Sequence, residues 1–208
     1  MKKHMGLWIL GLFAVLIGIY AIVQYGIIGV EQSGFYQTKV NVYKEWLSSI
    51  WHPMLATHIV GGTIALVIGP LLFVKKIRAT KLWLHQTIGY LYAGSIVLGG
   101  IAGGYVAFYA TGGLVAQLGF FFLAICWLGT TGMAVYYAVK RQRSIHRQWA
   151  IRSYSLTFAA VTLRLWLPLC MVLFGEEAYP TYYAAIAWLC WVPNLLFAWV
   201  YTKRDNKK

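Results

Sequence analysis

Long apolar stretches recur along the chain, and short polar segments separate them. Each stretch is close to or above the roughly 20 residues that a helix needs to cross the hydrocarbon core of a bilayer. The expected fold class is therefore all-α, a six-transmembrane-helix bundle, and residues 1–208 are expected to form a single membrane domain. The six helices are predicted at about residues 5–25, 53–74, 84–110, 114–138, 149–174 and 182–201.

The one long connection, residues 26–52, has a different pattern. Its apolar residues recur every three or four positions, which places them on one face of a helix. These residues are Tyr36, Val40, Tyr43, Leu47 and Ile50. Trp46 and Trp51 are of the type that anchors a segment at a membrane surface. The pattern predicts an amphipathic interfacial helix in the first extracytoplasmic loop, either as a cover over the bundle or as a lid over an outward-facing site.

Composition supports the membrane assignment, and charge adds an orientation. Of the 208 residues, 60% are hydrophobic and 11% are charged, with a formal net charge of +13. The basic residues gather before the first predicted helix, between the second and third, between the fourth and fifth, and at the C-terminus. All these segments fall on one side of a six-pass arrangement, so we expect both termini to be cytoplasmic. The lipid bilayer is then the expected partner, and nucleic acid is not.

Arg164 lies within an apolar stretch that runs from Ala150 to Phe174 and contains no carboxylate. An ionisable group at membrane depth is costly and usually marks a functional site. The partners that the sequence offers are helix carbonyls, the outer Glu176 or Glu177, neutral His58 and an anionic ligand.

Pro168 and the Pro193–Asn194 pair are expected to kink the fifth and sixth helices.

The histidines form two predicted layers. His85 opens the third helix and His146 precedes the fifth, both at cytoplasmic ends, so together they are candidates to ligate one metal or haem iron. Arg78 and Arg152 are among the basic residues that would meet haem propionates there.

The outer layer joins His58, near the outer end of the second helix, to Arg164. From His146 to Arg164 is 18 residues, or five whole helical turns, so both side chains are expected on one face of the fifth helix. His58 and Arg164 are candidates to hold a second metal or cofactor, or an anionic quinone or substrate group.

Three segments carry a family resemblance. They are HPMLATHIVGGTIALVIGP at 52–70, LHQTIGYLY at 84–92 and HRQWAIRSYSLTFAAVTLRLWLP at 146–168. They resemble the signatures of the bacterial membrane family called domain of unknown function 2306, over about residues 50–170. That resemblance implies a polytopic fold in a bacterial inner membrane and no particular reaction.

The histidine arrangement is further similar to that of cytochrome b561-type di-haem electron carriers, which pair four histidines across helices. Here the outer layer offers only His58 and His52, so this likeness extends to the inner haem alone.

Two functions follow, and the sequence leaves both open. The first is binding of a redox cofactor, b-type haem, by a membrane oxidoreductase or electron carrier with a quinone or another redox partner. The alternative is a non-enzymatic membrane binding or transport protein that recognises an anionic lipid or small molecule through His58 and Arg164. No phosphate-binding loop, zinc-protease motif or serine-hydrolase motif is present, which argues against an ATPase and against both hydrolase classes.

Overall fold

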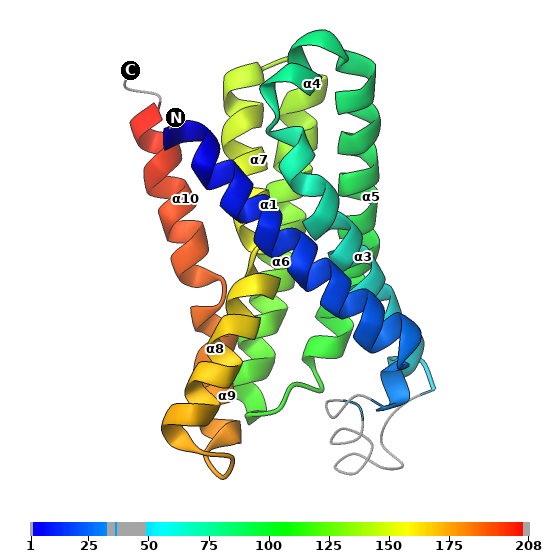
Figure 1. Cartoon of the computed structure of the whole chain (residues 1–208), viewed down its shortest axis with the longest axis vertical. Coiled ribbons are helices and arrows are strands. Elements are labelled where there is room, and N and C mark those ends of the chain that lie inside the picture. Colours follow the sequence, from blue (N-terminus) through cyan, green and yellow to red (C-terminus); the bar gives the residue numbers. More distant parts are fainter. Residues whose placement is uncertain (1, 33–35, 37–48, 206–208) are drawn as a thin grey trace. The chain divides into compact units, whose positions relative to one another are not determined.

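The computed structural model describes residues 2–32, 36 and 49–205. Every regular element in this part of the chain is helical (Figure 1). Within it, six segments are long and apolar enough to cross a membrane. They are Trp8–Ile27, Trp51–Leu72, Leu82–Ala107, Gly113–Val139, Arg143–Phe174 and Tyr179–Arg204. The predicted all-α fold with six membrane-spanning helices is confirmed.

The long connection is described only in part. Two short helical turns, η1 (Ile22–Ile27) and η2 (Val30–Gln32), follow the first long helix. The ring of Tyr36 lies against Trp51, with ring centroids 5.7 Å apart. Most of the predicted interfacial helix, residues 33–35 and 37–48, lies outside the described residues, so that helix stays a prediction.

Contacts divide the chain into two compact units, Met1–Tyr109 (unit 1) and Ala110–Lys208 (unit 2). Each unit is described by itself below. The single membrane domain over residues 1–208 therefore stays a prediction.

Unit 1 contains α1 (Lys2–Ala21), α3 (Trp51–Leu72), α4 (Lys75–Thr80) and α5 (Leu82–Ala107). The helix α3 packs along α5 and also against α1.

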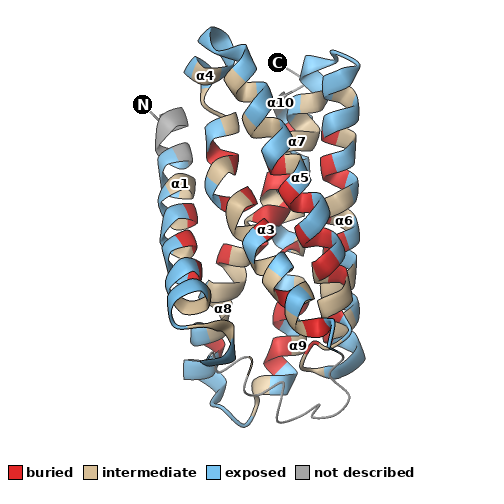
Figure 2. Ribbon diagram, turned by 90° about the vertical axis from the view of Figure 1, so that its right-hand side faces the viewer, coloured by how far each residue is buried: buried red, intermediate tan, exposed pale blue. Residues whose placement is uncertain are grey.

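Glycines bring the backbones of α3 and α5 together. A Cβ atom on Gly61 would lie 2.6 Å from the carbonyl oxygen of Ser95 and 3.0 Å from the Cα of Gly99. Both contacts are backbone atoms, so only a residue without a side chain fits there. Buried positions accordingly lie along the facing sides of α3 and α5 (Figure 2). Small residues commonly let membrane helices pack this closely.

Unit 2 contains α6 (Gly113–Val139), α7 (Arg143–Thr157), α8 (Ala159–Phe174), α9 (Tyr179–Leu189) and α10 (Val192–Asp205). The long helix α6 packs against α7 and α9, while α10 packs against α7 and α8 against α9. Gly112 precedes α6 with φ of +91°, a left-handed conformation that favours glycine.

The fifth and sixth spans are each interrupted within their length. Phe158 separates α7 from α8, and Cys190 and Trp191 separate α9 from α10. The second break lies just before Pro193, close to the predicted kink. The first break was not expected from the sequence, and the kink predicted at Pro168, which lies inside α8, stays a prediction.

Side chains supply hydrogen bonds at both breaks. The Nδ2 of Asn194 donates to the carbonyl oxygens of Ser155, at 3.3 Å, and Cys190, at 3.0 Å. The hydroxyl of Thr162 also donates to the Cys190 carbonyl. Carbonyls near a helix end lack intrahelical donors, and a bilayer interior offers no water to replace them. Asn194 therefore stabilises both interruptions at once.

Candidate functional site

Two of the predicted ligand histidines make the same kind of hydrogen bond. The Nδ1 of His58 on α3 lies 2.8 Å from the carbonyl oxygen of Gly99. The Nδ1 of His146 on α7 lies 2.8 Å from the carbonyl oxygen of Ala134. A carbonyl oxygen only accepts, so Nδ1 carries the proton in both rings. In the neutral ring, Nε2 then holds the lone pair, as in metal-bound histidines whose other nitrogen donates to a carbonyl.

Small residues on α5 create the space for His58. A Cβ atom on Gly103 would collide with the imidazole, at 2.8 Å from Cε1 and closer still to Nδ1. Gly103 therefore leaves room for the ring, and Gly99, one turn earlier, supplies the carbonyl. The small-residue face of α5 thus serves both the close contact with α3 and the orientation of His58.

The predicted ligand pairs are divided between the units. His58 and His85 are half-buried in unit 1, and His146 is half-buried in unit 2. Among the described residues, no group of three or more His, Cys, Asp or Glu side chains is arranged to hold a metal ion. Metal or haem ligation by His85, His146 and His58 stays a prediction.

The arginines predicted for the site have different surroundings. Arg78 is exposed on the short helix α4. Arg164 is half-buried on α8, and its Nη1 donates to the carbonyl oxygen of Ala160 at 2.9 Å. This is one of the helix-carbonyl contacts that the sequence allowed.

The break at Phe158 lies between His146 and Arg164. The count of five whole turns assumed one continuous helix. The shared face of the two side chains and their pairing with His58 stay predictions.

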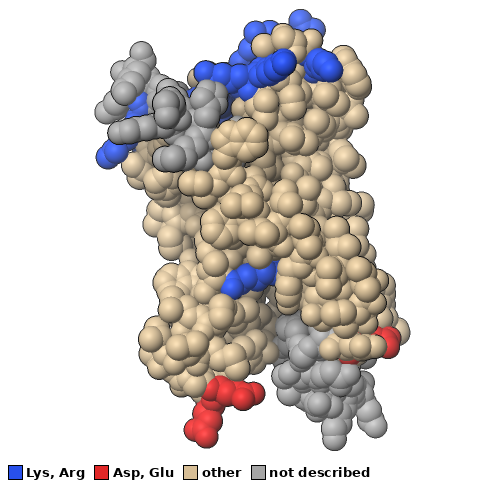
Figure 3. Space-filling view, in the orientation of Figure 1, with Lys and Arg blue, Asp and Glu red and all other residues tan. Residues whose placement is uncertain are grey.

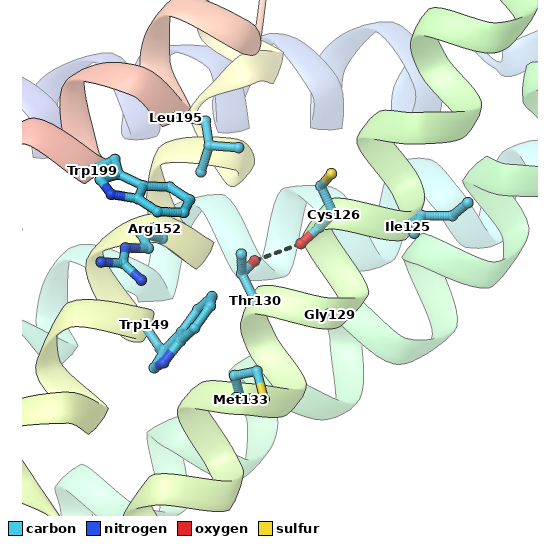
Figure 4. Close-up of a pocket in the computed structure, with 9 residues that line it drawn as sticks. All are labelled: Ile125, Cys126, Gly129, Thr130, Met133, Trp149, Arg152, Leu195 and Trp199. Atoms are coloured by element: carbon cyan, nitrogen blue, oxygen red, sulfur yellow. Dashed lines mark hydrogen bonds between the residues drawn. The ribbon is translucent and has the colours of Figure 1, made fainter.

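Among the predicted site residues in unit 2, Arg152 is buried and contacts side chains of both α7 and α10. It lies on α7 and is only 8% exposed. Its guanidinium carbon lies 4.6 Å from the ring centroid of Trp149 and 4.8 Å from that of Trp199 (Figure 4). Its Nη2 donates to the hydroxyl of Thr202 on α10 at 3.2 Å. The cation is thus held between two aromatic faces, an arrangement that stabilises its charge.

A pocket of about 390 Å³ lies beside this stack, between α6, α7 and α10. Its lining residues are Ile125, Cys126, Gly129, Thr130, Met133, Trp149, Arg152, Leu195 and Trp199 (Figure 4). The lining is mostly apolar, and the hydroxyl of Thr130 donates within its own helix, to the Cys126 carbonyl at 2.7 Å. In the part of the chain that the structure describes, the buried Nε of Arg152 has no hydrogen-bond partner. The pocket therefore contains one buried cation with unused donor capacity.

From the sequence, Arg152 was predicted only as one of several basic residues near the haem propionates, and the pocket was not predicted. Trp149 lies three positions before Arg152 on the same helix, a spacing at which side chains can meet. Trp199 and Thr202 come from α10, far along the chain, and no local pattern connects them to Arg152.

Charge is distributed unevenly in each unit. Lysine and arginine side chains gather at the end of unit 1 that carries α4 (Figure 3). In unit 2, Arg143 opens α7, whereas Glu176 and Glu177 lie at the turn between α8 and α9, where the span that begins with α7 ends.

These helices, by their lengths and hydropathy, define a polytopic all-α integral membrane protein. The chain belongs to the family of predicted membrane proteins DUF2306, whose family model matches residues 55–202. The matched range begins within α3 and reaches Thr202 on α10, so it includes the whole pocket around Arg152. The family resemblance of the three sequence segments is confirmed. Neither the comparison with curated proteins nor that with solved structures gives a match.

Proposed function

We propose that this membrane protein binds a redox cofactor, b-type haem, for electron transfer within or across the bilayer. The observation that supports the proposal best is that His58 and His146 make the same type of hydrogen bond. Each donates from Nδ1 to a backbone carbonyl oxygen at 2.8 Å. Such a bond fixes the orientation of the imidazole ring and raises the basicity of its Nε2, as expected of a histidine that ligates a metal. Haem would supply one-electron chemistry at its iron.

The chain's own residues would hold and neutralise the cofactor. His85 and His146 are the proposed inner ligands, and His58 is the proposed outer ligand. Arg78 and Arg152 are the proposed partners of the propionate groups, since guanidinium groups bind carboxylates well. A quinone or another redox partner would exchange electrons with the site.

A haem spectrum tests this function directly. Protein purified from haem-supplemented cells is expected to show a Soret band that shifts on reduction with dithionite. His85→Ala and His146→Ala are each expected to remove the inner haem, because each deletes one ligand. His4→Ala, near the start of α1, is the control and should keep the full haem content. A colourless wild-type preparation would refute haem binding, and full haem in both variants would refute this choice of ligands.

We also propose that the protein lies in a bacterial inner membrane with both termini in the cytoplasm. The basic α4 end of unit 1 and the acidic turn between α8 and α9 support this orientation under the positive-inside rule. A cysteine in place of Glu177 should react with an impermeant maleimide added to intact cells, and a cysteine in place of Lys76 should react only after permeabilisation. The reverse pattern would invert the topology.

The second candidate function is recognition of an anionic lipid or small acid through His58 and Arg164. The observation that favours it is a half-buried arginine within a membrane-spanning segment, at a depth where charges are usually functional. Arg164→Gln is expected to weaken binding of decanoate, while Arg204→Gln, at the exposed end of α10, should not. Equal affinity in both variants would count against this function.

A further inference from the structure

We infer that unit 2 binds an anionic phospholipid, with the lipid phosphate at Arg152 and part of one acyl chain in the pocket between α6, α7 and α10. This site gives Arg152 a lipid phosphate as its anion in place of the haem propionate proposed above, and it depends on residues of unit 2 alone.

The first argument is the burial of the Arg152 charge. The side chain is 8% exposed, and a buried cation is costly unless an anion or strong acceptors accompany it. The guanidinium carbon lies over the rings of both Trp149 and Trp199, and Thr202 accepts from Nη2. No aspartate or glutamate is among the described residues that line the pocket. Among the described residues Nε has no hydrogen-bond partner, so this donor is left for an anionic oxygen.

The second argument is depth. Thr202, the partner of Arg152, lies within one turn of the end of α10, where Lys203 and Arg204 follow it. The Nζ of Lys203 lies 5.5 Å from the ring centroid of Trp199. Tryptophan and basic residues at the end of a membrane-spanning helix typically mark the level of the lipid headgroups. The charged end of the pocket is therefore placed where phosphates lie.

The third argument is the direction of the apolar lining. Leu195 lies about two turns before Thr202 on α10, or about 10 Å further from the end of the helix. Ile125 and Met133, on α6, add further apolar surface. A cavity of about 390 Å³ is of the size that binds small ligands or part of a lipid chain. The pocket thus joins a cation at headgroup level to apolar lining that continues into the bilayer, which is the polarity of a phospholipid.

Native mass spectrometry of delipidated protein in an uncharged detergent tests the site. Phosphatidylglycerol and phosphatidylcholine with identical chains are titrated in separate experiments, and inorganic phosphate in a third. We expect phosphatidylglycerol to bind more tightly than phosphatidylcholine, because the choline group offsets the phosphate charge. Inorganic phosphate is expected to bind much more weakly than either lipid, since it has no chain.

Two pairs of variants separate the headgroup from the chain. Arg152→Gln is expected to weaken phosphatidylglycerol binding about tenfold or more. Arg143→Gln, an exposed residue that opens the same helix, should leave binding unchanged. Gly129→Leu should also weaken binding, because it fills the pocket from a position where a Cβ atom meets nothing within 4 Å. Gly132→Leu is its control, since that position is equally open but does not line the pocket.

Each contrary outcome would overturn the lipid site. Equal phosphatidylglycerol affinity in wild type, Arg152→Gln and Gly129→Leu would refute the proposed lipid site. Inorganic phosphate binding that matches phosphatidylglycerol and is insensitive to Gly129→Leu would show a free-phosphate site instead. If Arg152→Gln does not fold, comparing lipid binding by Gly129→Leu and Gly132→Leu still tests the site. Loss of haem in Arg152→Gln with unchanged lipid binding would assign Arg152 to haem, whereas colourless protein that binds lipid as expected would refute only the haem function.

Discussion

The hydroxyl groups of Ser153 on α7 and Thr131 on α6 share a hydrogen bond, with the two oxygens 2.7 Å apart. The Thr131 oxygen also lies 2.7 Å from the carbonyl oxygen of Trp127. A second bond runs from Nε1 of Trp127 to the hydroxyl of Thr157 at 2.9 Å. Because Ser153 directly follows Arg152, these bonds fix the part of α7 that carries the buried cation.

A double-mutant cycle measures the first of these bonds. Thr131→Val and Ser153→Ala should each lower the free energy of unfolding in detergent micelles. Their coupling energy is expected to be about 0.6 kcal/mol, a typical value for polar pairs between membrane helices. Thr130→Val is the control partner for Ser153→Ala, because Thr130 donates within its own helix. The control cycle should be additive, and a first cycle without coupling would contradict the bond.

Gly61→Ala should destabilise unit 1. The new methyl group would meet the Ser95 carbonyl at 2.6 Å, and a backbone atom cannot rotate away as a side chain can. The expected loss in the free energy of unfolding is about 1–3 kcal/mol. Gly62→Ala is the matched control, since a Cβ atom there has nothing within 4 Å. It should be neutral or stabilising by up to about 1 kcal/mol, because alanine favours helix more than glycine does. Equal effects of the two substitutions would disprove the close backbone contact.

Gly103→Ala should displace the ring of His58. Its methyl group would lie 2.8 Å from Cε1, so the imidazole must move and its bond to the Gly99 carbonyl must lengthen or break. Nitrogen NMR of histidine-labelled protein would detect this change at Nδ1. Gly94→Ala, on the same helix at an open position, should leave the His58 signals in place. An unchanged His58 spectrum in Gly103→Ala would show that the ring does not face Gly103.

Asn194→Leu should destabilise unit 2 more than Pro193→Ala. Asn194 donates to carbonyls beside both helix breaks, and loss of its amide leaves those carbonyls without that donor in the membrane. The expected loss is about 1–3 kcal/mol in the free energy of unfolding. If Pro193→Ala cost more, proline geometry rather than the amide would maintain the break in the sixth span.

The spans could be predicted from the sequence because length and hydropathy suffice to identify a membrane helix. The break at Phe158 could not, since neither glycine nor proline marks it, and the donors that stabilise it come from Asn194, on another helix. Proline therefore does not mark the break in the fifth span, whereas Pro193 lies just after the break in the sixth, and a kink at Pro168 stays a prediction.

The candidate site was predictable only as a set of residue types. Local spacing relates Trp149 to Arg152, but Trp199 approaches Arg152 only after α10 has packed against α7. The carbonyl partner of His58 likewise comes from a different helix. Histidine and arginine in apolar stretches identified candidates, and their actual neighbours depended on tertiary packing.

The amide of Asn194 has a mechanical consequence. It connects the end of α7 to the joint between α9 and α10, so a change of tilt at one break would strain a hydrogen bond at the other. The α7 and α10 walls of the Arg152 pocket lie on the same side of these two joints, and α6 supplies the remaining wall. If the fifth and sixth spans bend as a pair, Trp149, Arg152 and Trp199 would move together relative to α6.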